Sequence, residues 1–248
     1  MFLTHATRLF YDSLLTLAYP QSCAICCRSV EQRRFGVACE ACWNATRILS
    51  GTETICWKCG LLSDEVSPAR LDEVRCRRCE AQSFMAARAI GPYEGALRAS
   101  VLELKRQPHL SQHLEALLLD AARREPLNRC ARIVPVPLHA RRLKSRGFNQ
   151  ALVLAQASSR VLGSPVDEVS LVRVSSTEKY RAGLDAKGRQ DTVAGAFEVG
   201  HARLIANEDI LLVDDVFTTG ATVSACAEAL VSAGARTVCV LTVSRAFL

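Results

Sequence analysis

Residues 209–222, which read DILLVDDVFTTGAT, contain an apolar run, two adjacent aspartates and a turn rich in threonine. The run at 210–213 has the composition of a strand that is buried on both faces, as strands of parallel sheets are. We expect this strand to lead to the carboxyl edge of the sheet, where open α/β folds bind their ligands. Asp214 and Asp215 would then lie at that rim.

The turn that follows the aspartates is suited to an anion. It comprises Thr218, Thr219, Gly220, Ala221 and Thr222 and leads into a helix expected over 221–233. The free N–H groups and the positive dipole end of a helix N-terminus favour phosphate. Carboxylates would repel that phosphate, so we expect them to face ribose hydroxyls, a magnesium ion or both. The alternative is an acidic metal or phosphoacceptor site of a doubly wound protein.

The rest of the second half alternates between strands and helices. The sequence predicts two helices within 94–122, a strand over 131–137 with a polar loop after it, a helix over 149–162, strands over 170–174, 193–199 and 236–243, and Gly234 at the end of the helix 221–233. Such alternation implies right-handed crossovers. We therefore expect an α/β fold with a mostly parallel sheet covered on both faces.

Cysteine is concentrated in the first third of the chain. Eight of the twelve cysteines form four C-x-x-C pairs, with 12 residues between the first two pairs and 16 between the last two. Each such turn supplies two thiolates from one tight loop, and a structural zinc site needs four. The spacing predicts two zinc sites in a double zinc ribbon: Cys23/Cys26/Cys39/Cys42 and Cys56/Cys59/Cys76/Cys79.

Other readings of these cysteines stay open. An interleaved pairing of the four turns would also give two four-cysteine sites, and disulfides or iron–sulfur clusters use the same residue type. The spare Cys27 and the distant Cys130, Cys226 and Cys239 are interpreted as packing residues. A closed shell of four thiolates leaves no open coordination position, so we expect these metals to support folding and not catalysis.

Charge and hydropathy restrict the class of protein. The net charge is +6, and residues 88–160 carry 13 basic against 5 acidic side chains. This surplus indicates a polyanionic partner or a phosphorylated substrate, with a solvated basic face as the alternative. Charged residues interrupt every apolar stretch, so no membrane span is expected. Residues 1–19 predict an amphipathic helix that covers another surface, with a membrane-surface helix as the alternative, and they lack a cleavage site for export.

The segment LLVDDVFTTGAT resembles the 5-phosphoribosyl-1-pyrophosphate (PRPP) motif of type I phosphoribosyltransferases. Together with the segments VPVPL at 134–138 and RGFNQ at 146–150, it resembles the ComF family, which joins a cysteine-rich zinc module to a phosphoribosyltransferase-like domain. The resemblance implies a zinc module over residues 1–85 and a phosphoribosyltransferase-like domain over residues 86–248.

The resemblance also implies roles for individual residues. Asp214 and Asp215 would bind ribose and magnesium and serve catalysis, and residues 218–222 would bind the 5-phosphate. A pyrophosphate or nucleic-acid site would involve Arg141, Arg142, Lys144, Arg146 and Asn149. A mobile loop is expected over 175–192, where Leu184 and Arg189 match the family's pattern and Arg181 and Thr192 depart from it.

Two functions follow as hypotheses. The ComF resemblance implies a cytoplasmic protein of natural transformation that binds incoming single-stranded DNA, with a competence helicase as a partner. The alternative is an active phosphoribosyltransferase that moves ribose 5-phosphate from PRPP, with Mg²⁺, to a nitrogenous base. The two zinc ions are structural in both hypotheses.

Overall fold

The computed structural model describes residues 19–53, 55–62, 76–175 and 195–246. The expected N-terminal helix and almost all of the expected loop at 175–192 lie outside these residues. The helices are η1 (Arg33–Phe35), α2 (Glu40–Asn44), η2 (Arg77–Cys79), α3 (Gly95–Leu104), α4 (Gln112–Ala122), η3 (Leu127–Arg129), α5 (Ala140–Arg146), α6 (Gln150–Leu162), α8 (Ala202–Ile205) and α9 (Ala221–Ser232). The strands are β1 (Ala86–Pro92), β2 (Arg132–Pro135), β3 (Leu171–Arg173), β4 (Phe197–Val199), β5 (Asp209–Phe217) and β6 (Thr237–Arg245).

Four strands form a parallel sheet in the order β1-β6-β5-β2. The two central strands, β5 and β6, are almost wholly buried. Their continuous apolar runs are what a strand covered on both faces requires. The predicted α/β fold with a mostly parallel sheet is confirmed.

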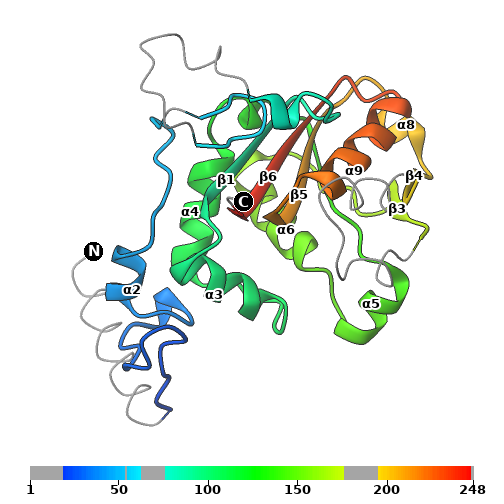
Figure 1. The fold of residues 1–248 in the computed structure, drawn as a ribbon. Coiled ribbons are helices and arrows are strands. Elements are labelled where there is room, and N and C mark those ends of the chain that lie inside the picture. The colour runs from blue at the N-terminus through cyan, green and yellow to red at the C-terminus, as the bar shows by residue number, and fades with distance from the viewer. Residues whose placement is uncertain (1–18, 54, 63–75, 176–194, 247–248) are drawn as a thin grey trace.

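Helices cover both faces of this sheet. Alternate residues of β5 point to opposite sides, so Leu211 and Val213 share one apolar core with residues of α3, α4 and α6, whereas Ile210 and Leu212 share a second core with residues of α9. Figure 1 shows α3 and α4 on one side of the strands and α9 on the other. The sheet is therefore the middle layer between two apolar cores.

The two cysteine-rich segments dock onto different cores. The first packs against α3 and α4: His113 of α4 makes edge-on ring contacts with Phe35 and Trp43, and the Ala96 N–H donates to Thr46 Oγ1 at 2.9 Å. The second lies against β1 and belongs to the other core, and there the Ala87 N–H donates to the Lys58 carbonyl at 2.6 Å. Each segment thus completes its small core with residues of the sheet layer.

Three sequence expectations need correction. Strands β3 and β4 pair antiparallel in a separate two-stranded sheet, so neither extends the parallel one. The polar loop expected after β2 contains α5, which ends at Gly147 in the left-handed conformation. Helix α5 has no buried residue, and without an apolar stripe it carries no periodic signal in the sequence.

The third correction concerns β5. It was expected to end at Val213 but continues to Phe217, because its pairing with β6 extends to Arg245. The aspartates at the rim therefore lie within the strand itself. Strand β1, the edge strand next to β6, was not predicted at all. Within the described residues, no helix is both long and apolar enough to cross a bilayer.

Candidate functional site

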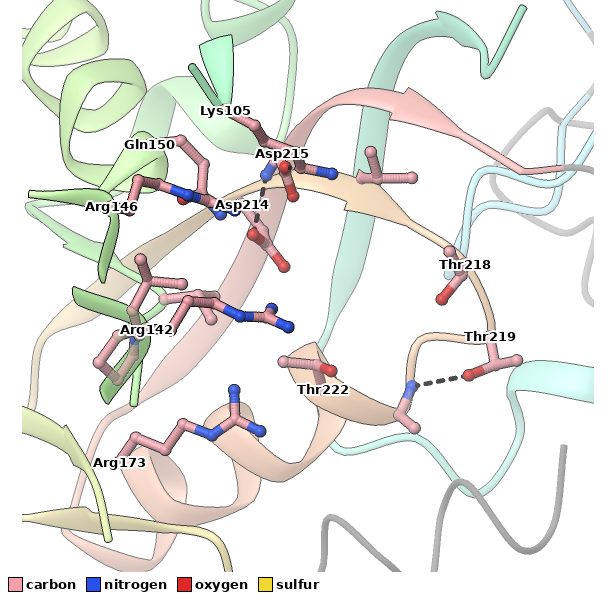
Figure 2. Close-up of a pocket in the computed structure, with 15 residues that line it drawn as sticks. Lys105, Arg142, Arg146, Gln150, Arg173, Asp214, Asp215, Thr218, Thr219 and Thr222 are labelled. Carbon is pink, nitrogen blue, oxygen red and sulfur yellow. Dashed lines mark hydrogen bonds and ion pairs between the residues drawn. The ribbon is translucent and has the colours of Figure 1, made fainter. Parts of the chain in front are cut away.

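A cavity of about 330 Å³ opens at the carboxyl ends of β5 and β2 (Figure 2). Its walls come from β5, the turn before α9, the α5 region and the ends of α3 and β3. The residues that line it are Lys105, Val136, Pro137, Leu138, Arg142, Arg146, Gln150, Arg173, Asp214, Asp215, Val216, Thr218, Thr219, Ala221 and Thr222. The cavity lies where a parallel α/β sheet is expected to bind a ligand.

The two aspartates have different environments although they are neighbours. Asp215 is buried, and its Oδ2 forms an ion pair with Lys105 Nζ at 3.0 Å, just beyond the end of α3. Asp214 accepts a hydrogen bond from the Asp215 N–H at 2.8 Å, and its carboxylate is directed toward the middle of the cavity (Figure 2). Asp215 therefore has a cationic partner within the protein, whereas Asp214 faces the space that a ligand would fill.

The pKa of Asp214 is raised well above its usual range, first by burial and then by the neighbouring charge of Asp215. Lys105 acts in the opposite direction but does not offset these causes. A carboxyl group in such a place is stabilised in its ionised form by an added cation. The cavity thus favours a positively charged ligand group at Asp214.

The turn from Thr218 to Thr222 leads directly into α9. Gly220 is the N-cap of this helix and has a φ of 82°, in the left-handed region that glycine tolerates best. A Cβ at Gly220 would also lie 2.5 Å from Gln82 Nε2 and 2.6 Å from Phe217 Cζ. The requirement for glycine therefore comes from the packing beneath the turn as well as from its backbone conformation.

The turn presents its polar groups to the cavity. Thr218, Thr219, Ala221 and Thr222 line it, while the Ala221 N–H donates to Thr219 Oγ1 at 3.4 Å. Helix α9 has 12 residues, and the positive end of its dipole lies at the turn. This end of the cavity has the properties of an anion site.

Cations form the wall opposite the turn. Arg142 and Arg146 project from α5, Arg173 from the end of β3, and Arg146 Nη1 donates to Gln150 Oε1 (Figure 2). Burial and the nearby charge of Arg142 lower the pKa of Arg146. Repulsion of this kind between two close arginines is relieved by an anion between them.

The remaining predicted residues of this region lie elsewhere. Arg141 and Lys144 are exposed and do not line the cavity. Asn149 caps α6, where its Oδ1 accepts from the Ala151 N–H at 3.0 Å and its Nδ2 donates to the Val136 carbonyl at 3.0 Å. It joins α6 to the end of β2 and so holds one wall in place.

Sequence reasoning missed three polar residues of the cavity. Lys105, Gln150 and Arg173 come from separate elements. Gln150 is the last residue of the segment RGFNQ, and the other two stand in no recognisable pattern. For Lys105 and Arg173, the available signal was only a basic residue at the end of a predicted helix or strand.

The eight paired cysteines come together in the two predicted sets of four, with all ligand sulfurs of a set within 4.8 Å of one another. In the first set the distances are 3.7 Å for Cys23–Cys42 and 3.6 Å for Cys26–Cys39. In the second they are 3.6 Å for Cys56–Cys79 and 3.5 Å for Cys59–Cys76. Zn–S bonds of about 2.3 Å in a tetrahedron place sulfurs about 3.8 Å apart, so each set fits one zinc ion.

The thiols of the first cluster differ in their pKa values. A hydrogen bond from Arg28 lowers the pKa of Cys26 to about 6, whereas burial and the other sulfurs raise the pKa of Cys42 to about 12. A zinc ion bound by all four sulfurs would take them as thiolates and displace the proton that Cys42 holds in its absence.

Comparison with known proteins gives several relatives. The DNA utilization protein YhgH of Escherichia coli K12 is 31% identical over 230 residues, which are 90% of this chain and 96% of that protein. Competence protein F of Haemophilus influenzae is 36% identical over 141 residues, or 55% of this chain and 60% of that protein. Competence protein ComFC of Bacillus subtilis is 32% identical over 102 residues, or 41% of this chain and 39% of that protein.

No family model matches the chain. Among solved structures, the glutamine PRPP amidotransferase of Bacillus subtilis, complexed with ADP and GMP, superposes with a TM-score of 0.38 at 16% identity. The superposition covers 57% of this chain and 30% of that chain.

Proposed function

Because the chain belongs to the ComF family, with its YhgH and competence-protein relatives, we propose that it acts in the use of DNA. In this role it binds single-stranded DNA, and its cavity binds PRPP together with Mg²⁺. We also propose that it works in the cytoplasm, where a competence helicase would be its partner.

Three kinds of chemical group surround the cavity, and their arrangement is the main support for PRPP as its ligand. The turn from Thr218 to Thr222 lies on one side, Arg142 and Arg146 lie on another, and Asp214 is directed between them. PRPP has the same distribution of chemistry: a 5-phosphate, a hydroxylated ribose and a pyrophosphate that carries magnesium.

Each part of the ligand would have its own group of residues. The helix N-terminus and the threonine hydroxyls would hold the 5-phosphate. Asp214 and Asp215 would accept from ribose hydroxyls, and Mg²⁺ would supply the positive charge that favours ionised Asp214. The arginines would bind pyrophosphate oxygens by charge-assisted hydrogen bonds.

Single-stranded DNA would bind through basic residues outside the cavity. Arg141 and Lys144 lie exposed on α5, on the helix that also supplies Arg142 and Arg146 to the cavity. Contacts from such residues to phosphates give affinity without sequence preference, and that affinity falls steeply with salt.

An active phosphoribosyltransferase is the second candidate, and the direction of the Asp214 carboxylate, toward the middle of the cavity, favours it (Figure 2). In this reaction the bond from ribose C1 to the pyrophosphate oxygen breaks and a bond from C1 to a nitrogen of the acceptor forms. Positive charge develops on the ribose in the transition state, and an ionised Asp214 beside it would stabilise that charge. Mg²⁺ would neutralise the leaving pyrophosphate.

Calorimetric titration of the zinc-loaded protein tests both candidates. We expect PRPP with Mg²⁺ to bind, and a short single-stranded oligonucleotide to bind with an affinity that drops between low and high salt. Release of pyrophosphate from PRPP in the presence of a nitrogenous base would establish the transferase. Absence of both PRPP and DNA binding would overturn the proposal.

A further inference from the structure

The second cysteine cluster is joined by hydrogen bonds to the turn that lines the cavity. Gln82 follows the ligand Cys79 by three residues, and its backbone N–H donates to the Cys79 carbonyl at 3.1 Å. The Gln82 side chain then reaches the turn, where Nε2 donates to the Thr219 carbonyl at 2.8 Å. One residue thus joins the metal-binding loop to the anion-binding turn.

The next residue forms a second link to the same region. The Ser83 N–H donates to Ser224 Oγ at 3.0 Å, in the first turn of α9. The Gln82 side chain also fills the space beside Gly220, at 2.5 Å from the position that a Cβ would occupy there. The path of the chain after Cys79 therefore sets the positions of both the turn and the helix that follows it.

A third link runs through the C-terminal strand. The guanidinium of Arg245 lies 4.2 Å from the ring centre of Phe217, the last residue of β5 before the turn. It also donates to the Cys59 carbonyl and, from Nη2, to Cys59 Sγ at 3.5 Å. Phe217 is held from the other side by an edge-on contact with Phe84, at 5.8 Å between ring centres.

The first cluster offers a contrast within the same molecule. It packs on α3 and α4 through Phe35, Trp43 and Thr46, at the other core of the sheet. Its neighbouring glutamine, Gln32, donates from Nε2 to Glu40 at 3.1 Å on the surface. Both clusters consist of four cysteines, but Gln82, Ser83 and Arg245 join the second one to the turn and to α9.

We propose that metal binding at Cys56, Cys59, Cys76 and Cys79 regulates the anion site, and that Gln82 is the positioning residue that transmits it. With the metal bound, the segment after Cys79 is held in one place and the turn presents its donors to the cavity. Loss of the metal frees that segment and lets the turn leave this conformation. The ligand that this would regulate is the one assigned under the proposed function.

This coupling must act in both directions, because linkage between two binding sites is reciprocal. A ligand that holds the turn in its binding conformation also favours the metal-bound form of the second cluster. PRPP with Mg²⁺ is therefore expected to slow the release of zinc from that cluster to a chelator. Release from the first cluster should stay the same.

Hydrogen exchange of the backbone amides at 218–224 tests the inference without any need for ligand. Gln82→Met keeps the length of the side chain and removes its N–H donor, with Gln32→Met as the matched control beside the first cluster. We expect exchange in the turn to rise about three- to tenfold in Gln82→Met, as the loss of one hydrogen bond implies. Zinc content and exchange in the core of β5 and β6 should match those of the unaltered protein.

Metal-ligand variants provide the second arm. Cys76→Ser should raise exchange in the turn at least as much as Gln82→Met does, whereas Cys42→Ser should raise it only around α2 and α4. Unchanged exchange in the turn in Cys76→Ser would overturn the regulation by metal, and unchanged exchange in Gln82→Met would overturn the role of Gln82. An equal rise of exchange in the turn in Cys42→Ser would also overturn the inference, since loss of either metal would then destabilise the whole protein.

The outcome is separable from that of the proposed function. If the unaltered protein binds no PRPP, the ligand assignment fails, while the exchange experiment still decides whether the cluster controls the turn. If PRPP binds and exchange in the turn is unchanged in Cys76→Ser, the coupling alone is wrong.

Discussion

At the scale of single residues, the two adjacent aspartates of β5 show how one strand creates two different acids. Successive side chains of a strand point to opposite faces, so Asp214 and Asp215 meet different neighbours. Asp215 forms an ion pair with Lys105 at the end of α3, whereas Asp214 faces the cavity. The sequence shows a pair of equal carboxylates, whereas their packing makes them unequal.

The raised pKa of Asp214 implies a cost in stability that Asp214→Asn should remove. The folded protein binds the proton of the Asp214 carboxyl group more tightly than the unfolded chain does. The contribution of this group to the free energy of unfolding is therefore fully present below the usual aspartate pKa and is lost as the pH rises through the higher folded pKa. We therefore expect Asp214→Asn to be more stable than the unaltered protein at neutral pH and equal to it in acid. Urea unfolding at several pH values measures this.

Asp209, in the same strand, is the matched control with the opposite sign. Hydrogen bonds from Arg236, and then from Thr237, lower its pKa. Its contribution to stability is present above the usual aspartate pKa and is lost as the pH falls through the lower folded pKa. Asp209→Asn should thus be less stable at neutral pH, and a gain in stability from it would contradict this account.

Removal of both carboxylates from the cavity should abolish binding of PRPP with Mg²⁺. In the double variant Asp214→Asn with Asp215→Asn we expect an affinity more than about 100-fold lower, because two charged partners of ribose and metal are lost. Calorimetry measures the affinity, and circular dichroism shows whether the fold is kept. An unaltered affinity in a folded variant would remove the acid pair from the assignment.

At the scale of elements, α5 divides its basic residues between two surfaces. Arg142 and Arg146 line the cavity and Arg141 does not, although all three stand on one short helix. We expect Arg142→Ala and Arg146→Ala each to lower the affinity for inorganic pyrophosphate about tenfold, which is the loss of one charge-assisted hydrogen bond.

Arg141→Ala is the control for this comparison, since it removes the same charge from the same helix. Pyrophosphate affinity should change little in it, while the affinity for single-stranded DNA should fall and show a weaker dependence on salt. Equal losses of pyrophosphate affinity in all three variants would indicate a diffuse electrostatic effect and would contradict the cavity assignment.

The junction between β2 and α6 depends on Asn149. Its Oδ1 caps the helix and its Nδ2 holds the Val136 carbonyl, so Asn149→Ala should lower the free energy of unfolding by about 1–2 kcal/mol. Asn149→Asp keeps the capping oxygen and loses only the amide donor, so its loss should be smaller. Denaturant unfolding of the two variants separates the capping of α6 from the hydrogen bond to Val136. Equal losses of stability in both would assign the whole contribution of Asn149 to its contact with Val136.

At the scale of the whole molecule, the two four-cysteine clusters pack against different cores. Cys39→Ser should release about one zinc ion of two and unfold the first cysteine segment, because a structural site needs all four ligands. Metal analysis measures the zinc content. The fluorescence of Trp43 should change, because its ring contact with His113 would be lost. Full metal content in this variant would contradict the assignment of Cys39 as a ligand.

Much of the fold was predictable because its signals are local. The apolar runs of β2, β5 and β6 and the periodic leucines of α3 and α4 reflect burial that repeats along the chain. Strand β1 was missed because its sequence, AARAIGP, contains one large apolar residue, Ile90, and its other residues are small ones, an arginine and a proline, which do not indicate a buried strand. Its place was determined by pairing with β6, which is distant in sequence.

The sequence by itself determined the elements that chemistry defines locally: the aspartate pair, the threonine turn before α9 and the four C-x-x-C turns. Each is a short segment that its residue types alone suffice to identify. The tertiary structure alone decided which groups surround them, since Lys105, Arg173 and Gln82 come from three distant segments and meet the strand end only when the layers pack. Contacts between distant segments depend on the whole packing, and no local pattern of residues records them.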